Sequence, residues 1–431
     1  MGPTVFTGYD NIEGSGEVLA LMNAGAPVET AEAGDIVEVL FDTTPFYAES
    51  GGQAGDHGTL EWPGGEAEVI DVRKHAGDLH VLVAQVTAGK LELGTRAAQL
   101  VDAEKRRTSR ANHSAAHLLH TALKNVLGPA VAQKGQLVDA ERARFDFSHG
   151  APLTEAELSA IETEVNAVIR QNVPAETKLM APQEAIEAGA IALFGEKYGD
   201  EVRVLTLGRS LVSDNAPYSV ELCGGTHVAR TGDIALFKIV QETGVAAGVR
   251  RIEALTGEAA RQYLLAQAGV ARSLAQSFKV QTADVPARVD SLAASVKSLE
   301  KQVAELKKQL ALGGGSGASS APEEINGVKL MARVLDGVDG KGLRGVAEDF
   351  RKQVGTGVVA LIGVTEGKAA VTVAVTSDLT DRVNAADLAR AAVIAMGGQG
   401  AGGKPDFAQG GAPDGSKAED GLAAVRAALA G

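Results

Sequence analysis

A heptad pattern in the second half of the chain constrains the fold most, because it predicts a long helix that needs a partner helix. Residues 257–312 are nearly all helix-forming, and apolar side chains recur there three and four positions apart, at Val289, Leu292, Val296, Leu299, Val303, Leu306 and Leu310. Valine at one core position and leucine at the other favours a two-stranded coiled coil. The partner is either a second subunit or the preceding helix around residues 263–278. The closeness of these helices in sequence favours a hairpin within one chain.

The segment after this pattern separates the last part of the chain from the rest. Residues 313–322 are almost entirely glycine, serine and alanine, which is typical of a flexible linker. Residues 323–431 then alternate strand-like and helix-like patterns, which predicts a small α/β domain. Near its end, Gly403 and Lys404 belong to a glycine-rich loop whose backbone N–H groups can surround a phosphate, although it lacks the spacing of a P-loop.

The first 104 residues carry the pattern of a small β-barrel. Short valine-rich runs at 35–41, 67–72 and 79–86 are separated by turns that contain glycine and aspartate. A glycine-rich loop with the aromatic pair Phe46 and Tyr47 lies between the first two runs. On composition alone we interpret this loop as an ordinary turn.

Two short motifs within residues 105–256 predict a metal site. His113 and His117 are four positions apart in a helical pattern, so both imidazoles leave the same face of the helix. Cys223 and His227 are also four apart, and the two glycines between them predict a tight loop that brings a thiolate and an imidazole to one point. Cys223 is the single cysteine among 431 residues, and there are eight histidines. One cysteine and three histidines in this arrangement favour zinc over a chance pair of helical histidines.

A basic cluster comes at the start of the histidine helix and consists of Lys105, Arg106, Arg107 and Arg110. It is either a solvated helix face or a patch that contacts phosphate, and its position beside the metal motif slightly favours the second. A charged helix at 154–171 opens with a capping box of Thr154 and Glu157, and strand-like runs lie on both sides of it. Residues 105–256 are therefore predicted to form an α+β domain that holds the metal.

The composition limits the partners and the location of the protein. A net charge of −14 disfavours nonspecific binding to nucleic acid, so such contacts must come from local basic clusters. A single cysteine excludes an intramolecular disulfide and fits a reducing compartment. No apolar run is long enough to span a bilayer, and the N-terminus has no signal-peptide pattern, so we expect a cytoplasmic protein without membrane contact.

Several motifs, taken in order, resemble the C-terminal part of bacterial alanyl-tRNA synthetases. They are the runs at 44–53, 112–117, 144–148, 192–198, 223–227 and 403–409. The opening Phe6-Thr-Gly-Tyr9 is also more like the synthetases than like the free-standing editing proteins related to them. The domain that charges tRNA would precede these motifs in such an enzyme, so we expect no ATP-dependent aminoacylation from this chain.

The resemblance implies a hydrolytic editing activity that removes serine or glycine from mischarged tRNA-Ala. The zinc positions of the family match His113, His117, Cys223 and His227. Gln133 matches a glutamine that the family uses for editing, and Thr226, between two ligands, is a second candidate catalytic residue through its hydroxyl. Many members carry threonine at the position of Ala116, so that hydroxyl is absent here.

The resemblance also implies that the C-terminal domain binds tRNA and contributes to a homodimer, for which the coiled coil is a second candidate. The candidate tRNA-binding residues are Arg106, Arg107, Arg110, Gly403 and Lys404. The expected architecture is an α+β multidomain chain. Its parts are a small β-barrel (1–104), an α+β zinc-containing editing domain (105–256), a helical coiled-coil hairpin (257–312), a flexible linker (313–322) and a small α/β tRNA-binding domain (323–431).

Two other functions are compatible with the same residues. The zinc could be structural, in a module that binds tRNA or dimerises without activity of its own, because four protein ligands would close a site in which catalytic zinc usually keeps one position open. The chain could also be a different zinc hydrolase, such as a phosphoesterase. It lacks a cluster of aspartates and histidines able to bind two metals, which argues against that reading.

Overall fold

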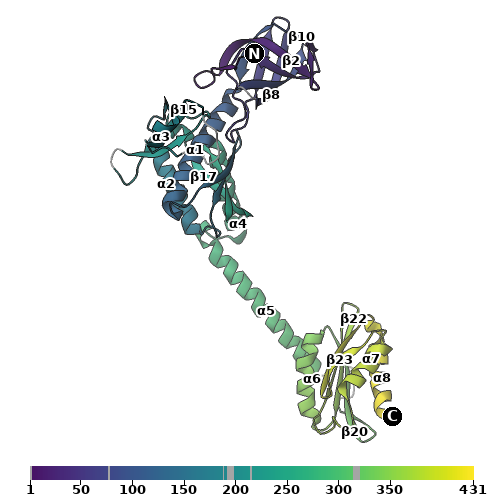
Figure 1. Cartoon of the computed structure of the whole chain (residues 1–431). Coiled ribbons are helices and arrows are strands. Elements are labelled where there is room, and N and C mark those ends of the chain that lie inside the picture. The colour runs from purple at the N-terminus through teal and green to yellow at the C-terminus, as the bar shows by residue number, and fades with distance from the viewer. Residues whose placement is uncertain (1, 76–77, 188, 192–198, 214–215, 314–320) are drawn as a thin grey trace. The chain divides into compact units, whose positions relative to one another are not determined.

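The computed structural model describes residues 2–75, 78–187, 189–191, 199–213, 216–313 and 321–431 (Figure 1). These residues form two compact units, Met1–Ala271 and Arg272–Gly431. The motif at 192–198 and most of the expected linker at 313–322 lie outside the described residues. No described helix is both long enough and apolar enough to cross a membrane.

The first unit begins with the predicted small β-barrel. Six strands pair in the order β11-β7-β8-β9-β5-β2, and β11 also pairs with β2, which closes the ring. Their bounds are β2 (Glu13–Asn23), β5 (Ile36–Phe41), β7 (Gly58–Trp62), β8 (Gly65–His75), β9 (Leu79–Ala88) and β11 (Arg96–Val101). Shorter strands flank the ring: β1 (Val5–Phe6), β3 (Ala26–Val28), β4 (Thr30–Glu32), β6 (Thr43–Thr44) and β10 (Lys90–Glu92). Alternate side chains, among them Val39, Leu60 and Leu82, point inward and are fully buried, as period-two patterning requires.

The remainder of the first unit has an α+β arrangement around helix α1 (Ala103–Leu127). Asp102 caps this helix, because its side chain accepts hydrogen bonds from the backbone N–H groups of Glu104 and Lys105. Helix α2 (Glu155–Arg170) begins at the predicted capping box of Thr154 and Glu157. Leu118, Leu119 and Leu123 of α1 share one core with α2 and the strands.

Two antiparallel sheets complete this α+β arrangement. The larger sheet has the order β12-β13-β18-β17, with β12 (Gln133–Val138), β13 (Ala143–Ser148), β17 (Phe237–Ala246) and β18 (Val249–Thr256). The smaller has the order β14-β15-β16, with β14 (Glu176–Met180), β15 (Val202–Arg209) and β16 (Pro217–Leu222), and a short helix α3 (Pro182–Glu187) follows β14. Strand β16 ends one residue before Cys223, as the sequence predicts.

Two helices follow, α4 (Gly257–Phe278) and α5 (Val285–Gly313). The apolar seam lies on α5, where Val289 is 48% exposed, Val303 50% and Leu306 58%. Helix α4 runs from the first unit into the second, so the predicted pairing of α4 with α5, or of α5 with a second subunit, stays a prediction.

The C-terminal part is the predicted small α/β domain. Its sheet has the order β19-β20-β21-β22-β24-β23, and only β20 and β21 run parallel among the described pairs. The strands are β19 (Glu323–Ile325), β20 (Val328–Asp336), β21 (Val358–Thr365), β22 (Lys368–Val375), β23 (Ala401–Lys404) and β24 (Phe407–Ala412). Helix α6 (Gly340–Val354) packs on one face of the sheet, and α7 (Ala385–Ala395) and α8 (Ala418–Ala430) pack on the other.

The glycine-rich segment near the end of the chain differs from the expected loop. Residues 401–404 and 407–412 form the hairpin β23–β24, in which Gly402 pairs with Gln409 and Gly403 with Ala408. A Cβ on Gly403 would lie 2.3 Å from the carbonyl oxygen of Phe407, so the close approach of the two strands requires glycine there. The backbone groups of Gly403 and Lys404, which were predicted to surround a phosphate, therefore belong to a pair of strands.

Candidate functional site: a cluster of three histidines and one cysteine

The first half of the site lies on helix α1. His113 and His117 leave the same face of the helix, and their ring centroids are 5.1 Å apart. Both side chains are buried, with 1% and 7% exposure. The helix is held on the core by its apolar face, so the spacing of four residues places both imidazoles at one point of the domain interior.

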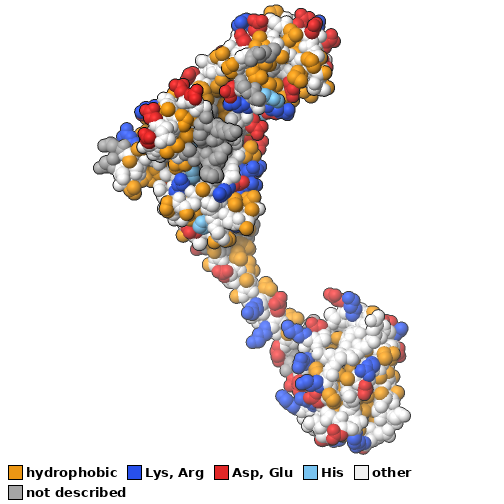
Figure 2. All heavy atoms as spheres, viewed as in Figure 1, with side chains coloured by type: hydrophobic (Ala, Val, Ile, Leu, Met, Phe, Trp, Pro, Cys, Tyr) orange, Lys and Arg blue, Asp and Glu red, His pale blue; other side chains and the backbone are white. Residues whose placement is uncertain are grey.

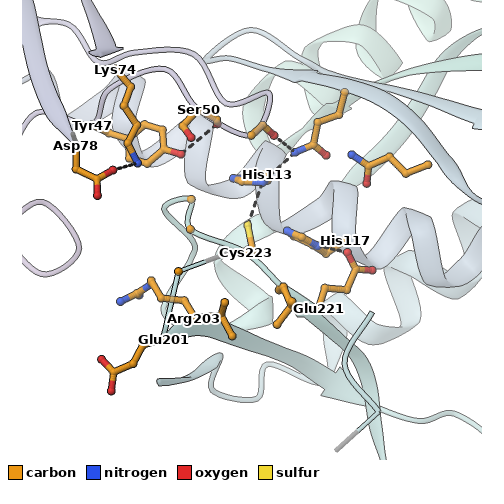
Figure 3. A pocket seen from close by; sticks show the side chains of 18 residues that line it. Tyr47, Ser50, Lys74, Asp78, His113, His117, Glu201, Arg203, Glu221 and Cys223 are labelled. Carbon is orange, nitrogen blue, oxygen red and sulfur yellow. Dashed lines mark hydrogen bonds and ion pairs between the residues drawn. The ribbon is translucent and has the colours of Figure 1, made fainter. Parts of the chain in front are cut away.

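The second half is the loop that follows β16. The Sγ atom of Cys223 lies 3.2 Å from Nε2 of His227 and 3.5 Å from Nε2 of His113. One donor atom from each of these residues and from His117 lies within 4.8 Å of the others. Figure 3 shows Cys223 directed toward the imidazoles on α1. The structure therefore brings together all four predicted metal ligands.

The glycines of the loop are required by the packing. A Cβ on Gly225 would lie 2.2 Å from Cε1 of His113 and 2.9 Å from Oε1 of Gln53, closer than real Cβ contacts. Tyr9 adds a contact from the N-terminal segment, because its hydroxyl donates to the carbonyl of Gly224 at 2.8 Å. The guanidinium of Arg203 lies 3.4 Å from the centroid of the Tyr9 ring. These contacts hold the loop against helix α1.

In each of the three histidines of the cluster, the Nδ1 atom lies within hydrogen-bond distance of a neighbouring side chain. The partner of His113 is Oε1 of Gln53 at 2.8 Å, and that of His117 is Oε2 of Glu221 at 2.6 Å. The partner of His227 is Oγ of Ser114 at 3.2 Å. The Nε2 atom of His117 is buried and has no hydrogen-bond partner among the described residues. Histidines held at Nδ1 present Nε2 to a metal ion, so the donors present fit one.

Glu221 connects two histidines of α1. Its Oε1 atom lies 2.9 Å from Nδ1 of His120, whose ring centroid lies 5.4 Å from that of Phe145. Burial raises the pKa of Glu221, but His117 and His120 together lower it to about 2. Burial lowers the pKa of His117, whereas Glu221 and Cys223 raise it to about 10. The carboxylate thus stays ionised and orients both imidazoles.

The electrostatics of the cluster favour a cation. Burial raises the pKa of the Cys223 thiol, but His113, His227 and His117 outweigh burial and hold that pKa well below its usual range. Burial, with added repulsion from His113, lowers the pKa of His227 to about 4. A thiolate and a carboxylate therefore lie beside the neutral imidazole of His227, and a divalent cation that binds there would displace the proton that Glu221 and Cys223 hold on His117.

A cavity of about 400 Å³ adjoins the cluster and is lined by residues of the barrel and of the α+β part. Gln133, the first residue of β12, lines it as the sequence predicts, and so do Gln136, Lys74 and Arg203. The other predicted catalytic residue, Thr226, is 1% exposed. Its hydroxyl accepts a hydrogen bond from Nε2 of Gln53 at 2.9 Å. The geometry gives Thr226 a role in holding the loop rather than a place on the cavity wall.

The basic cluster at the start of α1 does not form one surface. Arg106 is 1% exposed and donates hydrogen bonds to Asp56 and to the carbonyls of Gly8 and Pro45. The expectation that Arg106 contacts tRNA does not fit this burial, because an ion pair between α1 and the barrel uses its guanidinium. Arg110 is half-buried and donates to the carbonyls of Gly8 and Tyr9. Arg107 remains exposed, paired with Glu104.

Three residues of the site could not be predicted from the sequence. Gln53 and Glu221 contact the predicted metal ligands His113 and His117, and Gln136 lies 3.2 Å from Nε2 of His113. Two of them had a signal in the sequence: Gln53 ends the Ser-Gly-Gly-Gln run, and Glu221 stands two residues before Cys223. Neither signal indicates which histidine the residue would contact.

Family comparisons indicate the class of protein, because domains of aminoacyl-tRNA synthetases match two parts of the chain and a DHHA1 domain matches a third. Residues 2–105 match the family described as tRNA synthetases class II (A), and residues 202–253 match the threonyl and alanyl tRNA synthetase second additional domain. Residues 327–431 match the DHHA1 domain.

Whole-chain comparisons give the particular family. The alanine–tRNA ligases of Caulobacter vibrioides and of Caulobacter sp. strain K31 are each 69% identical over the whole chain, and that of Hyphomonas neptunium is 54% identical. The chain belongs to the alanyl-tRNA synthetase family and corresponds to the C-terminal part of its bacterial members. It spans about half the length of these relatives, 49% in each case. The crystal structure of the C-Ala domain from Aquifex aeolicus alanyl-tRNA synthetase is 26% identical with a TM-score of 0.25, over 26% of this chain and 98% of that one.

Proposed function

We propose that this chain hydrolyses the ester bond of tRNA-Ala mischarged with serine or glycine, using zinc held by His113, His117, Cys223 and His227. The observation that carries the proposal is the convergence of these four donors within 4.8 Å beside a cavity of about 400 Å³. Three imidazoles and a thiolate are ligands that suit zinc. The similarity of residues 202–253 to the second additional domain of threonyl and alanyl tRNA synthetases supports editing.

The residues around the cavity have separate tasks in this reaction. When bound, zinc supplies a Lewis acid that orients or polarises polar groups of the aminoacyl moiety. Gln133 and Gln136 line the cavity and offer amide groups to the aminoacyl ester. Lys74 is paired with Asp78 in the cavity wall, so Arg203 is the candidate cation for the phosphates of the tRNA end. An aminoacyl ester is reactive, so positioning it and a water molecule accounts for most of the acceleration needed.

Selection of serine over alanine follows from polarity rather than size. A site that expects a polar partner rejects an analogue lacking the hydroxyl by about 10⁴-fold, whereas size alone discriminates far less. The half-buried thiolate and the imidazoles offer such partners to a serine hydroxyl but only a poor environment to the methyl group of alanine.

We propose that tRNA is bound mainly by the C-terminal domain, around helix α6 and the hairpin β23–β24. Gly403 and Lys404 are exposed at the end of β23, and the guanidinium of Arg344 on α6 lies 5.2 Å from the centroid of the Phe407 ring on β24. Figure 2 shows lysine and arginine side chains gathered over α6. Arg107 and Arg110 remain candidates for tRNA contacts near the editing cavity. We also propose that the chain forms a homodimer, either through the apolar seam of α5 or through the C-terminal domain. We propose a cytoplasmic location for it.

The test compares deacylation of Ser-tRNA-Ala with that of Ala-tRNA-Ala by the full chain. The proposal predicts fast loss of serine, slow loss of alanine, and loss of activity in His117→Ala. A protein that binds tRNA and zinc but leaves both esters intact would instead be a binding module with a structural zinc. Hydrolysis of simple phosphodiesters without action on mischarged tRNA would make the chain a different zinc hydrolase.

A further inference from the structure

Gln53 belongs to the barrel domain in sequence but lies inside the metal cluster in space. It sits on the loop between β6 and β7 and is fully buried. The loop is fastened to strand β12, because the N–H of Ala54 donates to the carbonyl of Val138 and the N–H of Val138 donates to the carbonyl of Gly52. A Cβ on Gly52 would lie 2.5 Å from Cγ of Gln136, so this close docking requires glycine. The Gly-Gly turn therefore carries the Gln53 side chain into the cluster.

The orientation of the Gln53 amide is fixed by its contact with Thr226. The backbone N–H of Thr226 can only donate, and it lies 2.9 Å from Oε1 of Gln53. Nε2 of Gln53 then donates to the hydroxyl of Thr226 at 2.9 Å. The same Oε1 atom lies 2.8 Å from Nδ1 of His113, so Nδ1 must carry the proton of that imidazole.

Gln136 fixes the same tautomer from the other side of the ring. Its Nε2 donates to the carbonyl of Gly51 at 2.8 Å, which identifies this atom as a donor. The same atom lies 3.2 Å from Nε2 of His113, so that nitrogen accepts and carries the lone pair. The contacts of Gln53 and Gln136 therefore indicate the same tautomer, in which the unprotonated Nε2 of His113 faces Cys223. A metal ligand needs this orientation.

We propose that Gln53 is a positioning residue of the metal centre, supplied by the barrel domain. Its single amide sets the tautomer of His113 on α1 and holds Thr226, which stands between the ligands Cys223 and His227. Gly225 provides the space, because a Cβ there would lie 2.9 Å from Oε1 of Gln53. The inference rests on the metal site of the proposed function. It adds that the four ligands are aligned only while the barrel loop is docked.

The test measures metal affinity rather than catalysis, using cobalt(II) in the full chain with a chelator as competitor. Thiolate-to-cobalt absorption reports binding at Cys223. Gln53→Met keeps the length of the side chain but removes its hydrogen bonds, and we expect affinity to fall about 10–100-fold. Gln53→Glu can accept from His113 and from both the N–H and the hydroxyl of Thr226, so it should recover most of that affinity.

The matched control is Gln99→Met. Gln99 is 1% exposed in the same barrel, and its amide bonds to Thr43 and Thr44 rather than to the cluster. We expect native cobalt affinity from this variant. Equal affinity in native protein and Gln53→Met would overturn the inference, whereas failure of the native protein to bind cobalt or zinc would overturn the proposed metal site itself.

A second variant keeps the inference testable if Gln53→Met does not fold. Thr226→Val removes the hydroxyl that accepts from Gln53 but leaves the backbone N–H in place. We expect a loss of cobalt affinity of several-fold, smaller than that of Gln53→Met, because one of three hydrogen bonds is lost. Unchanged affinity in a folded Thr226→Val protein would contradict the inference.

Discussion

Oε2 of Glu221 lies 2.6 Å from Nδ1 of His117, on the side of the imidazole opposite the cluster. The same carboxylate reaches His120, and both contacts are buried. A carboxylate behind a ligand histidine fixes the ring and increases the basicity of the nitrogen that faces the metal. The pair therefore links strand β16 to helix α1 directly behind the site, two residues before Cys223 joins the cluster.

We predict that Glu221→Gln weakens zinc binding by about 10–100-fold. A glutamine can accept a hydrogen bond at only one end, so either His117 or His120 would face an NH₂ group and need the opposite tautomer. Competition with a chelator measures the change. Glu253→Gln, which alters a carboxylate paired with Arg142, is the control and should bind zinc as the native chain does. Equal affinity in the two variants would show that Glu221 does not orient His117.

Arg106 and Asp56 form a buried ion pair between helix α1 and the barrel. We predict that Arg106→Leu lowers the free energy of unfolding of the first unit by about 3–5 kcal/mol, because Asp56 would be left buried and unpaired. Arg107→Leu is the neighbouring control. Its side chain is 60% exposed, so the change should stay within about 0.5 kcal/mol.

Urea unfolding followed by the fluorescence of Trp62, the single tryptophan, reports on the barrel. Matching midpoints for the two arginine variants would show that the ion pair contributes no more than a surface contact does. Partial recovery in the double variant Arg106→Met, Asp56→Leu would support the ion-pair account, because no charge then remains buried.

Substitution of Lys404 tests whether the hairpin β23–β24 of the C-terminal domain contacts tRNA, as proposed. Lys404→Ala should weaken tRNA binding, and the slope of log affinity against log salt concentration should become about one unit shallower, as expected for the loss of one phosphate contact. Lys368→Ala, an exposed lysine at the start of β22, is the control and should leave the slope unchanged. Identical slopes for native protein and Lys404→Ala would remove this hairpin from the tRNA surface.

Local patterns were enough to predict the elements that carry the four predicted metal ligands. The spacing of His113 and His117 specifies a shared helix face, and the glycines beside Cys223 specify a tight loop. The strands of the barrel and the alternation of the C-terminal domain follow from period-two and helical patterns, which the structure confirms. These features depend on neighbours within a few residues.

Features that depend on distant residues could not be predicted. Gln53 and Thr226 are 173 positions apart, and the pairing of Arg106 with Asp56 spans 50 positions. An arginine beside other basic residues resembles a surface cluster until the fold supplies a buried carboxylate. The hairpin β23–β24 was missed for a related reason, because its glycines indicate flexibility locally but allow close strand pairing in the folded domain.

Zinc titration of the metal-free chain, followed by single-turnover deacylation of Ser-tRNA-Ala, tests the central claim most directly. Acid or a chelator removes the metal, since the ligands must be deprotonated to hold it. The account predicts that the metal-free chain is inactive and that the rate rises with added zinc to a plateau at one ion per chain. Cys223→Ala should stay inactive over the same range of zinc. A full deacylation rate in the metal-free protein would contradict the account.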